Sequence, residues 1–189
     1  YHISDTIKDL GAEEIIGGYD RDGGYDGHSF IKSKGIDLSW PFAELLKMDA
    51  IVLLNVDAGA LGGTRRAYLR DFVRNGGGLI VLGGLWSFGK GRYEGTALEE
   101  VLPVKTSGPW EIKSFPNGVV LSPGLPHKIT SGLSWTQKPS VMYYHYLIPK
   151  PDSETVIQTT PGMQNIAPPL MHGGDASLEM HSGGAPLLI

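Results

Sequence analysis

The feature that most constrains the fold is a pair of aliphatic runs separated by an amphipathic segment. Residues 49–57 read Asp-Ala-Ile-Val-Leu-Leu-Asn-Val-Asp, and residues 78–84 read Gly-Leu-Ile-Val-Leu-Gly-Gly. Continuous aliphatic runs of this length are typical of strands buried on both faces, the usual situation in parallel sheets. We therefore expect these two runs to be neighbouring strands of a parallel sheet.

The segment between the two runs predicts a helix over residues 64–75. Its apolar positions 68, 69, 72 and 73 fall on one stripe of a helix, and most of its charged residues lie elsewhere. Thr64 can cap the start of this helix, and Gly76 can adopt the left-handed conformation that ends it. Strand, helix and strand in succession make a right-handed βαβ unit, so the sequence predicts the α/β class.

The length and charge of the chain limit its partners. A chain of 189 residues fits a single domain, and an apolar content of 41% supplies a hydrophobic core. A formal net charge of −4 gives no bulk attraction for nucleic acid or for an anionic membrane, so we expect neither as a partner. No apolar run approaches the length of a membrane span. The sequence does not determine a compartment; we favour the cytoplasm.

The rest of the chain predicts shorter elements around this unit. Helices are expected at residues 3–10, 41–47 and 96–102, a loop at 20–27, and strands at 12–16, 110–113, 118–121, 141–147 and 154–159. The stretch 161–186, rich in Gly, Pro, Met and His, is expected to be a long loop. Residues 186–189 look like the beginning of a strand, so we expect the chain to be part of a longer polypeptide.

Several motifs in residues 49–160 resemble a known family. They are the two strands above, Trp-Ser-Phe-Gly at 86–89, Gly-Thr-Ala-Leu-Glu-Glu-Val-Leu-Pro-Val at 95–104, and Pro-His-Lys-Ile-Thr-Ser-Gly-Leu at 126–133. Together they resemble a bacterial branch of the class I glutamine amidotransferase-like superfamily. That branch is similar to trehalose-utilisation-type proteins and to amidotransferase-like domains of glycoside hydrolases. Lys128 stands where these relatives usually have proline. The resemblance implies a flavodoxin-like, three-layer α/β sandwich with a mostly parallel sheet.

The resemblance does not carry the activity of true amidotransferases. Those enzymes place a cysteine on a sharp turn after the strand that matches residues 79–82, where its thiolate meets backbone N–H groups and a histidine. This chain has Gly-Gly-Leu-Trp-Ser-Phe-Gly at 83–89 and no cysteine at all. Glutamine hydrolysis through a cysteine is therefore excluded, as are a disulfide framework and a thiolate zinc site.

The predicted sheet brings candidate ligand-binding residues to one edge. Asp57 follows one strand, and Gly83 and Gly84 follow its neighbour, so both strand ends should lie where ligands bind in open α/β sheets. The predicted ligand-binding residues are Asp57, Gly83, Gly84, Trp86, Ser87, Phe88, Arg92, Tyr93 and His145. Aromatic faces with one cation suit a sugar or a small carboxylate. The alternative is that these aromatic side chains fill the edge as part of the core.

Three functions remain open from the sequence. The first is a non-catalytic domain that binds a small ligand or a partner domain at this edge. The second is a hydrolase with Ser87 as nucleophile and His145 as base, oriented by Asp57 or Glu99; Leu85 makes its Gly-x-Ser-x-Gly elbow incomplete. The third is an assembly domain of a larger carbohydrate-processing protein. Exposed strand edges also favour pairing with a second copy of the chain.

Other polar clusters do not predict a cofactor or a metal. Residues 20–27 place carboxylates at alternate positions, as in a calcium loop, but the closing glutamate is missing. The spacing of Met171, His172, Asp175, Glu179 and His181 matches no metal motif. The glycines at 76–78 precede a strand, so they do not form a phosphate loop. The arginines at 65, 66, 70 and 74 form a basic helix face, which we expect to be solvated.

Overall fold

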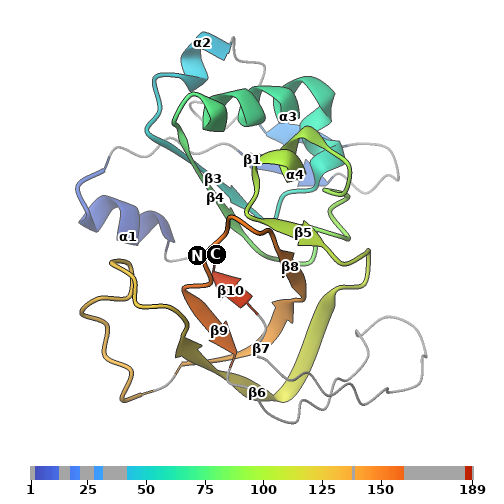
Figure 1. Ribbon diagram of the computed structural model, residues 1–189. Helices are drawn as coiled ribbons and strands as arrows, with labels where there is room; N and C mark the ends of the chain where they lie inside the picture. Colours follow the sequence, from blue (N-terminus) through green and yellow to red (C-terminus); the bar gives the residue numbers. More distant parts are fainter. Residues whose placement is uncertain are drawn as a thin grey trace. The chain divides into compact units, whose positions relative to one another are not determined.

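The computed structural model describes residues 3–12, 18–21, 28–31, 42–137, 139–159 and 186–188 (Figure 1). The chain divides into two compact units, residues 1–49 and 50–189. The elements of the first unit are α1 (Ile3–Asp9), β1 (Gly18–Arg21), β2 (His28–Ile31) and α2 (Phe42–Leu45), and β1 pairs with β2 in antiparallel fashion.

The first unit confirms both short helices predicted for it. Gly11 has φ +72° and follows α1, as expected of a residue that ends a helix. The loop predicted at 20–27 is wrong at its first two residues. Asp20 and Arg21 belong to β1, because their backbones pair with β2. Residues 22–27, and residues 13–16 of the strand predicted at 12–16, lie outside the described residues.

The second unit contains the predicted βαβ arrangement. Strands β3 (Ala50–Leu54) and β4 (Gly78–Leu82) pair in parallel, in a register that runs from Ala50 opposite Gly78 to Leu54 opposite Leu82. Helix α3 (Ala58–Arg74) connects them and packs against β4 and against α4 (Ala97–Val101), as Figure 1 shows. The α/β class and this unit are therefore confirmed.

Helix α3 begins earlier than predicted. Its N-cap is Asp57, whose Oδ1 accepts hydrogen bonds from the N–H groups of Gly59 at 2.6 Å and Ala60 at 3.2 Å. The predicted cap, Thr64, lies inside the helix, so that prediction is wrong. Gly62, with φ +71° and ψ 166°, interrupts the helical backbone, which explains why the apolar stripe is regular only after it. Gly76, at φ +95°, ends the helix as predicted.

The expectation that β3 and β4 are buried on both faces is wrong. In β3, Leu53 is buried, whereas Val52 and Leu54 are each 38% exposed. Ile80 on β4 is 48% exposed. The alternation shows that one face of this two-stranded pair is covered and the other is open, because successive side chains of a strand point to opposite faces.

The remaining described strands pair in antiparallel fashion. They are β5 (Val104–Thr106), β6 (Ile112–Pro123), β7 (Ser140–His145), β8 (Leu147–Pro149), β9 (Ile157–Thr159) and β10 (Pro186–Leu188). One sheet has the order β10–β9–β6–β7, and β5 pairs with β8. The described residues therefore show a single parallel pair, β3–β4, rather than a mostly parallel sheet.

The strand predicted at 118–121 and residues 112–113 of the strand predicted at 110–113 belong to the single strand β6, whose register with β7 shifts between Ser114 and Val119. Residues 110 and 111 precede β6, so the predicted start of that strand is wrong. Strand β5 was not predicted. The strand expected at the end of the chain is confirmed as β10. Of the predicted loop 161–186, only Pro186 lies within the described residues.

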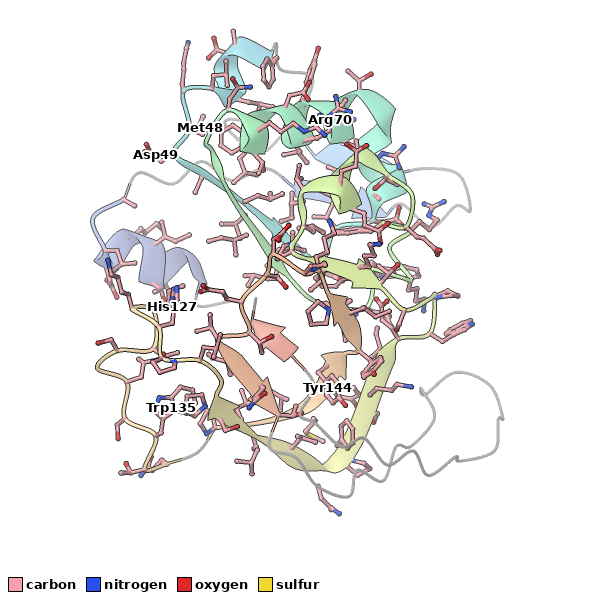
Figure 2. All side chains as sticks on the ribbon, viewed as in Figure 1. Met48, Asp49, Arg70, His127, Trp135 and Tyr144 are labelled. Carbon is pink, nitrogen blue, oxygen red and sulfur yellow. The ribbon has the colours of Figure 1, made fainter. Side chains whose placement is uncertain are left out.

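A small aromatic core fixes the end of β7. Phe115 of β6 and Tyr144 of β7 stack with ring centroids 5.2 Å apart, and Val119 and Tyr146 pack beside them. Figure 2 shows Tyr144 on β7. Burial raises the pKa of Tyr144 to about 12, because the buried site disfavours the phenolate. The next residue is His145, so this core holds the backbone from which the histidine projects.

We predict that two glycines of the βαβ unit respond oppositely to alanine. A Cβ on Gly77 would lie 2.2 Å from Cζ of Phe72, which is 1% exposed and has no room to move. Gly77→Ala should destabilise the protein by about 1–3 kcal/mol through overpacking. Gly63→Ala, where the nearest atom is 4.0 Å away, should be neutral or stabilise by up to about 1 kcal/mol through helix propensity.

Urea unfolding of the two variants checks this prediction. Equal midpoints for Gly77→Ala and the parent protein would show that Phe72 does not pack against the turn before β4.

Candidate functional site

The ends of β3 and β4 lie side by side, as predicted, and Asn55 connects them. Its N–H donates to the carbonyl of Leu82 at 3.2 Å, and its Oδ1 accepts the N–H of Trp86 at 2.7 Å. Asn55 has φ +51°, a left-handed conformation that asparagine tolerates better than most residues. A Cβ on Gly84 would lie 2.5 Å from the same Oδ1, so the close approach of the two strand ends requires glycine there.

Asp57 caps α3 and also forms an ion pair with Arg92. Nη2 of Arg92 donates to Oδ1 at 2.6 Å, and Nε donates to Oδ2 at 3.3 Å. The carboxylate is 6% exposed and the guanidinium side chain 63% exposed. The hydrogen bond to Asp57 raises the pKa of Arg92 above its usual value. A Cβ on Gly59 would lie 2.2 Å from Nη2 of Arg92, so the guanidinium lies directly over the first turn of α3.

Three predicted ligand-binding residues are buried beneath this edge. Tyr93 is fully buried, and its hydroxyl donates to the carbonyl of Val56 at 2.8 Å. Phe88 is 7% exposed, and its ring lies 5.5 Å from the Tyr93 ring and 4.9 Å from the His145 ring. Ser87 is also fully buried, and its hydroxyl donates to the carbonyl of Leu82 at 3.4 Å. These side chains form the support of the site.

A buried carboxylate that the sequence analysis missed holds His145. Nδ1 of His145 lies 3.1 Å from Oε1 of Glu111, and the same oxygen accepts the N–H of Gly89. Oε2 of Glu111 is buried and has no hydrogen-bond partner among the described residues. Because the carboxylate is an acceptor, this contact requires a proton on Nδ1 of His145. Glu111 therefore sets both the position and the tautomer of the imidazole.

The other edge of the imidazole faces the end of β4. A Cβ on Gly83 would lie 2.8 Å from Cδ2 of His145 and 3.1 Å from Nε2. Gly83 is exposed, and the His145 side chain beside it is 11% exposed. The arrangement offers Nε2, which can accept a hydrogen bond or carry a proton, beside an open strand end. Because residue 83 is a glycine, it places no side chain against the imidazole.

The carboxylates predicted to orient His145 bind elsewhere. Asp57 engages Arg92 and the start of α3, and Glu99 accepts the N–H groups of Gly95 at 2.9 Å and Thr106 at 3.1 Å. The orienting group is Glu111. Within the described part of the chain, Ser87 and His145 share no hydrogen bond. A hydrolase based on these two residues remains a prediction, which Ser87→Ala tests.

The remaining motifs have structural partners. The Pro-His-Lys-Ile-Thr-Ser-Gly-Leu segment at 126–133 forms a turn in which both N–H and hydroxyl of Thr130 donate to the carbonyl of His127 at 3.1 Å. Three of the four arginines of the α3 face have partners: Arg65 bonds to Leu61, Arg70 to Asp71 and Arg74 to Glu100. Figure 2 shows Arg70 on α3.

The described residues show neither a metal cluster nor a membrane-spanning helix. They contain no group of three or more histidine and acidic side chains able to hold a metal ion. None of the described helices combines the length and apolarity required to cross a bilayer. The acidic loop at 22–27 and the cluster at 171–181 lie outside the described residues.

These observations define an α/β domain with a carboxylate-anchored histidine at the ends of two parallel strands. A family described as "Putative glutamine amidotransferase" matches residues 45–177. The chain belongs to this glutamine amidotransferase-like family, which confirms the resemblance seen in the sequence. No curated protein matches the chain.

Two solved structures share the fold. Cytoplasmic protein STM1381 from Salmonella typhimurium LT2 is 24% identical, with a TM-score of 0.58. Cytoplasmic protein STM3548 from Salmonella typhimurium is 22% identical, with the same TM-score. Each comparison covers 76% of this chain and 75% of the other chain.

We predict that capping, more than ion pairing, is the stabilising role of Asp57. Asp57→Asn keeps an oxygen that accepts the N–H groups of Gly59 and Ala60, and it removes only the charge opposite Arg92. Because Arg92 is well exposed, the ion pair should contribute no more than about 1 kcal/mol. Asp57→Ala also removes the cap and should cost a further 0.5–2 kcal/mol or so.

Urea unfolding of both variants separates the two contributions. If Asp57→Asn is as destabilised as Asp57→Ala, the ion pair rather than the cap holds the start of α3.

Proposed function

We propose that this chain is a non-catalytic amidotransferase-like domain that binds a small ligand at the ends of β3 and β4. The observation that carries this proposal is the Nε2 edge of His145, held by buried Glu111 over the exposed backbone of Gly83. A fixed imidazole beside open backbone presents a directed hydrogen-bonding group to a molecule at this edge.

The energetic cost of the arrangement also supports a binding role. A buried carboxylate is costly unless all its acceptors are used, and Oε2 of Glu111 has no partner among the described residues. Left-handed backbone at Asn55, Phe88 and Arg92 adds strain around the same edge. Costly groups and strained backbone gather at functional sites more often than elsewhere.

The same site lacks the nucleophile that glutamine hydrolysis by true amidotransferases requires. A glycine stands at the end of β4, no cysteine occurs in the 189 residues, and the hydroxyl of Ser87 is buried against Leu82. An imidazole without a nucleophile can bind and orient, but it cannot form a covalent acyl intermediate. We therefore infer a pseudoenzyme that recognises a sugar or a small carboxylate.

Three further properties are proposals of the same kind. The parallel β3–α3–β4 unit has the kind of connection from which a flavodoxin-like sandwich is built, and we propose that the whole domain follows that architecture. A cytoplasmic location is supported by the names of the two similar Salmonella proteins. A partner domain or second copy at this edge remains an alternative occupant.

The test is a thermal-shift screen of sugars, amino acids, small carboxylates and divalent metals, with His145→Asn beside the parent protein. In this variant the asparagine Nδ2 replaces Nδ1 and still donates to Glu111, while Nε2 is lost. A ligand at a hundredfold excess over its Kd stabilises the folded parent by about 2.7 kcal/mol. We expect that stabilisation to fall by at least half in His145→Asn.

Ser87→Ala serves as a control and should bind as the parent does, because the hydroxyl is buried against Leu82. No stabilisation of the parent by any compound, or equal stabilisation of His145→Asn, contradicts a ligand site at this edge.

A further inference from the structure

The ammonium of Lys90 lies against two tryptophan rings beside the site. Its Nζ is 4.6 Å from the centroid of the Trp86 ring and 5.9 Å from that of the Trp110 ring. Both distances are within the range of cation–π attraction. Trp110 is 60% exposed, so a large apolar ring is presented to solvent at a position the sequence analysis did not select.

Close backbone packing brings these three side chains together and joins them to the His145 site. The N–H of Gly89 donates to Glu111, and a Cβ on Gly89 would lie 1.9 Å from the carbonyl oxygen of Gly108. Gly89, the residue before Lys90, therefore packs directly against Gly108, two residues before Trp110. The Gly89–Glu111 contact that positions His145 also places Lys90 beside Trp110.

The ammonium of Lys90 can still pair with an anionic ligand. Within the described ranges, no carboxylate forms an ion pair with its ammonium, and no oxygen accepts a hydrogen bond from it. An ammonium carries three N–H donors, and contact with ring faces uses none of them as a directed hydrogen bond. A half-buried cation in this state favours an anion.

We propose that the ligand of this edge is a small carboxylate carried on a ring, recognised by Lys90 together with the faces of Trp86 and Trp110. The inference rests on the proposed function and names its ligand class. The carboxylate would pair with Nζ of Lys90, and the ring would stack on the exposed Trp110 face, where partly positive C–H groups meet the negative π cloud. A cationic ligand is disfavoured, because the ammonium of Lys90 already lies beside both rings and repels a second cation.

Two sources share this chemistry, a sugar acid and an aromatic acid, and calorimetric titration distinguishes them. The probes are glucuronate, benzoate, glucose as a ring without a carboxylate, and acetate as a carboxylate without a ring. We expect glucuronate or benzoate to bind at least about tenfold more tightly than glucose and acetate, because only the ring acids use both contacts.

The variants then assign the contacts. Lys90→Met removes the charge and should weaken the ring acid about tenfold, whereas Lys90→Arg should stay within about threefold of the parent protein. Trp110→Ala removes an exposed ring and should weaken binding by a similar factor without loss of fold. Lys128→Met, at an exposed lysine in the turn between β6 and β7, is the matched control and should bind as the parent does.

Unchanged affinity of Lys90→Met for the ring acid, or a parent protein that binds neither ring acid, overturns the ligand class. If another compound from the screen binds and is lost in His145→Asn but not in Lys90→Met, the binding site stands and only this inference fails. If no compound binds at all, the proposed function fails with it.

Discussion

The carboxylate of Glu111 is the contact on which the site depends. It precedes β6, and through one oxygen it holds both the loop after β4, at Gly89, and the end of β7, at His145. Glu111 and His145 are distant in sequence. The antiparallel register of β6 and β7 makes their contact possible, since Ile112, the residue after Glu111, lies opposite His145. A charged acceptor shared by two donors is stronger than a neutral one, so this group can fix the loop and the imidazole together.

The backbone around this contact is held in conformations that most residues avoid. Asn55, Phe88 and Arg92 all have positive φ, and each such residue costs on the order of 1–3 kcal/mol. The neighbouring glycines serve a different purpose. Gly83, Gly84 and Gly89 have no positive φ, but a Cβ at any of them would collide with a neighbour. The glycines therefore allow close approach of chain segments, and the strain is carried by larger residues.

Local patterns predicted the part of the fold that local interactions determine. The βαβ unit follows from aliphatic periodicity, and Gly76 ends α3 because only a residue tolerant of left-handed backbone fits there. The start of α3 was not predicted, because the Gly-rich residues before Thr64 hide a helical turn that depends on the Asp57 cap. The edge formed by Asp57 and Gly83 was predicted from parallel pairing alone.

The missing parts of the site depend on contacts between distant residues. Glu111 and His145 are 34 positions apart, and nothing in the sequence around Glu111 distinguishes it from Glu99 as a partner for the histidine. Burial likewise separates Tyr93, which bonds to Val56 beneath the site, from Trp110, which is exposed beside it. Sequence composition identified aromatic residues here, but only the folded structure shows that Tyr93 is buried and Trp110 is exposed.

The most direct test of this account is the tautomer of His145, read from a long-range proton–nitrogen NMR spectrum at neutral pH. The six histidines of the chain are resolved by comparison with His145→Asn, which lacks the signal of interest. We expect a proton bound to Nδ1 of His145 and protected from exchange by Glu111, with that protection reduced in Glu111→Gln. A bare Nδ1 with the proton on Nε2 alone would mean that Glu111 does not hold the imidazole, and the proposed site would lose its basis.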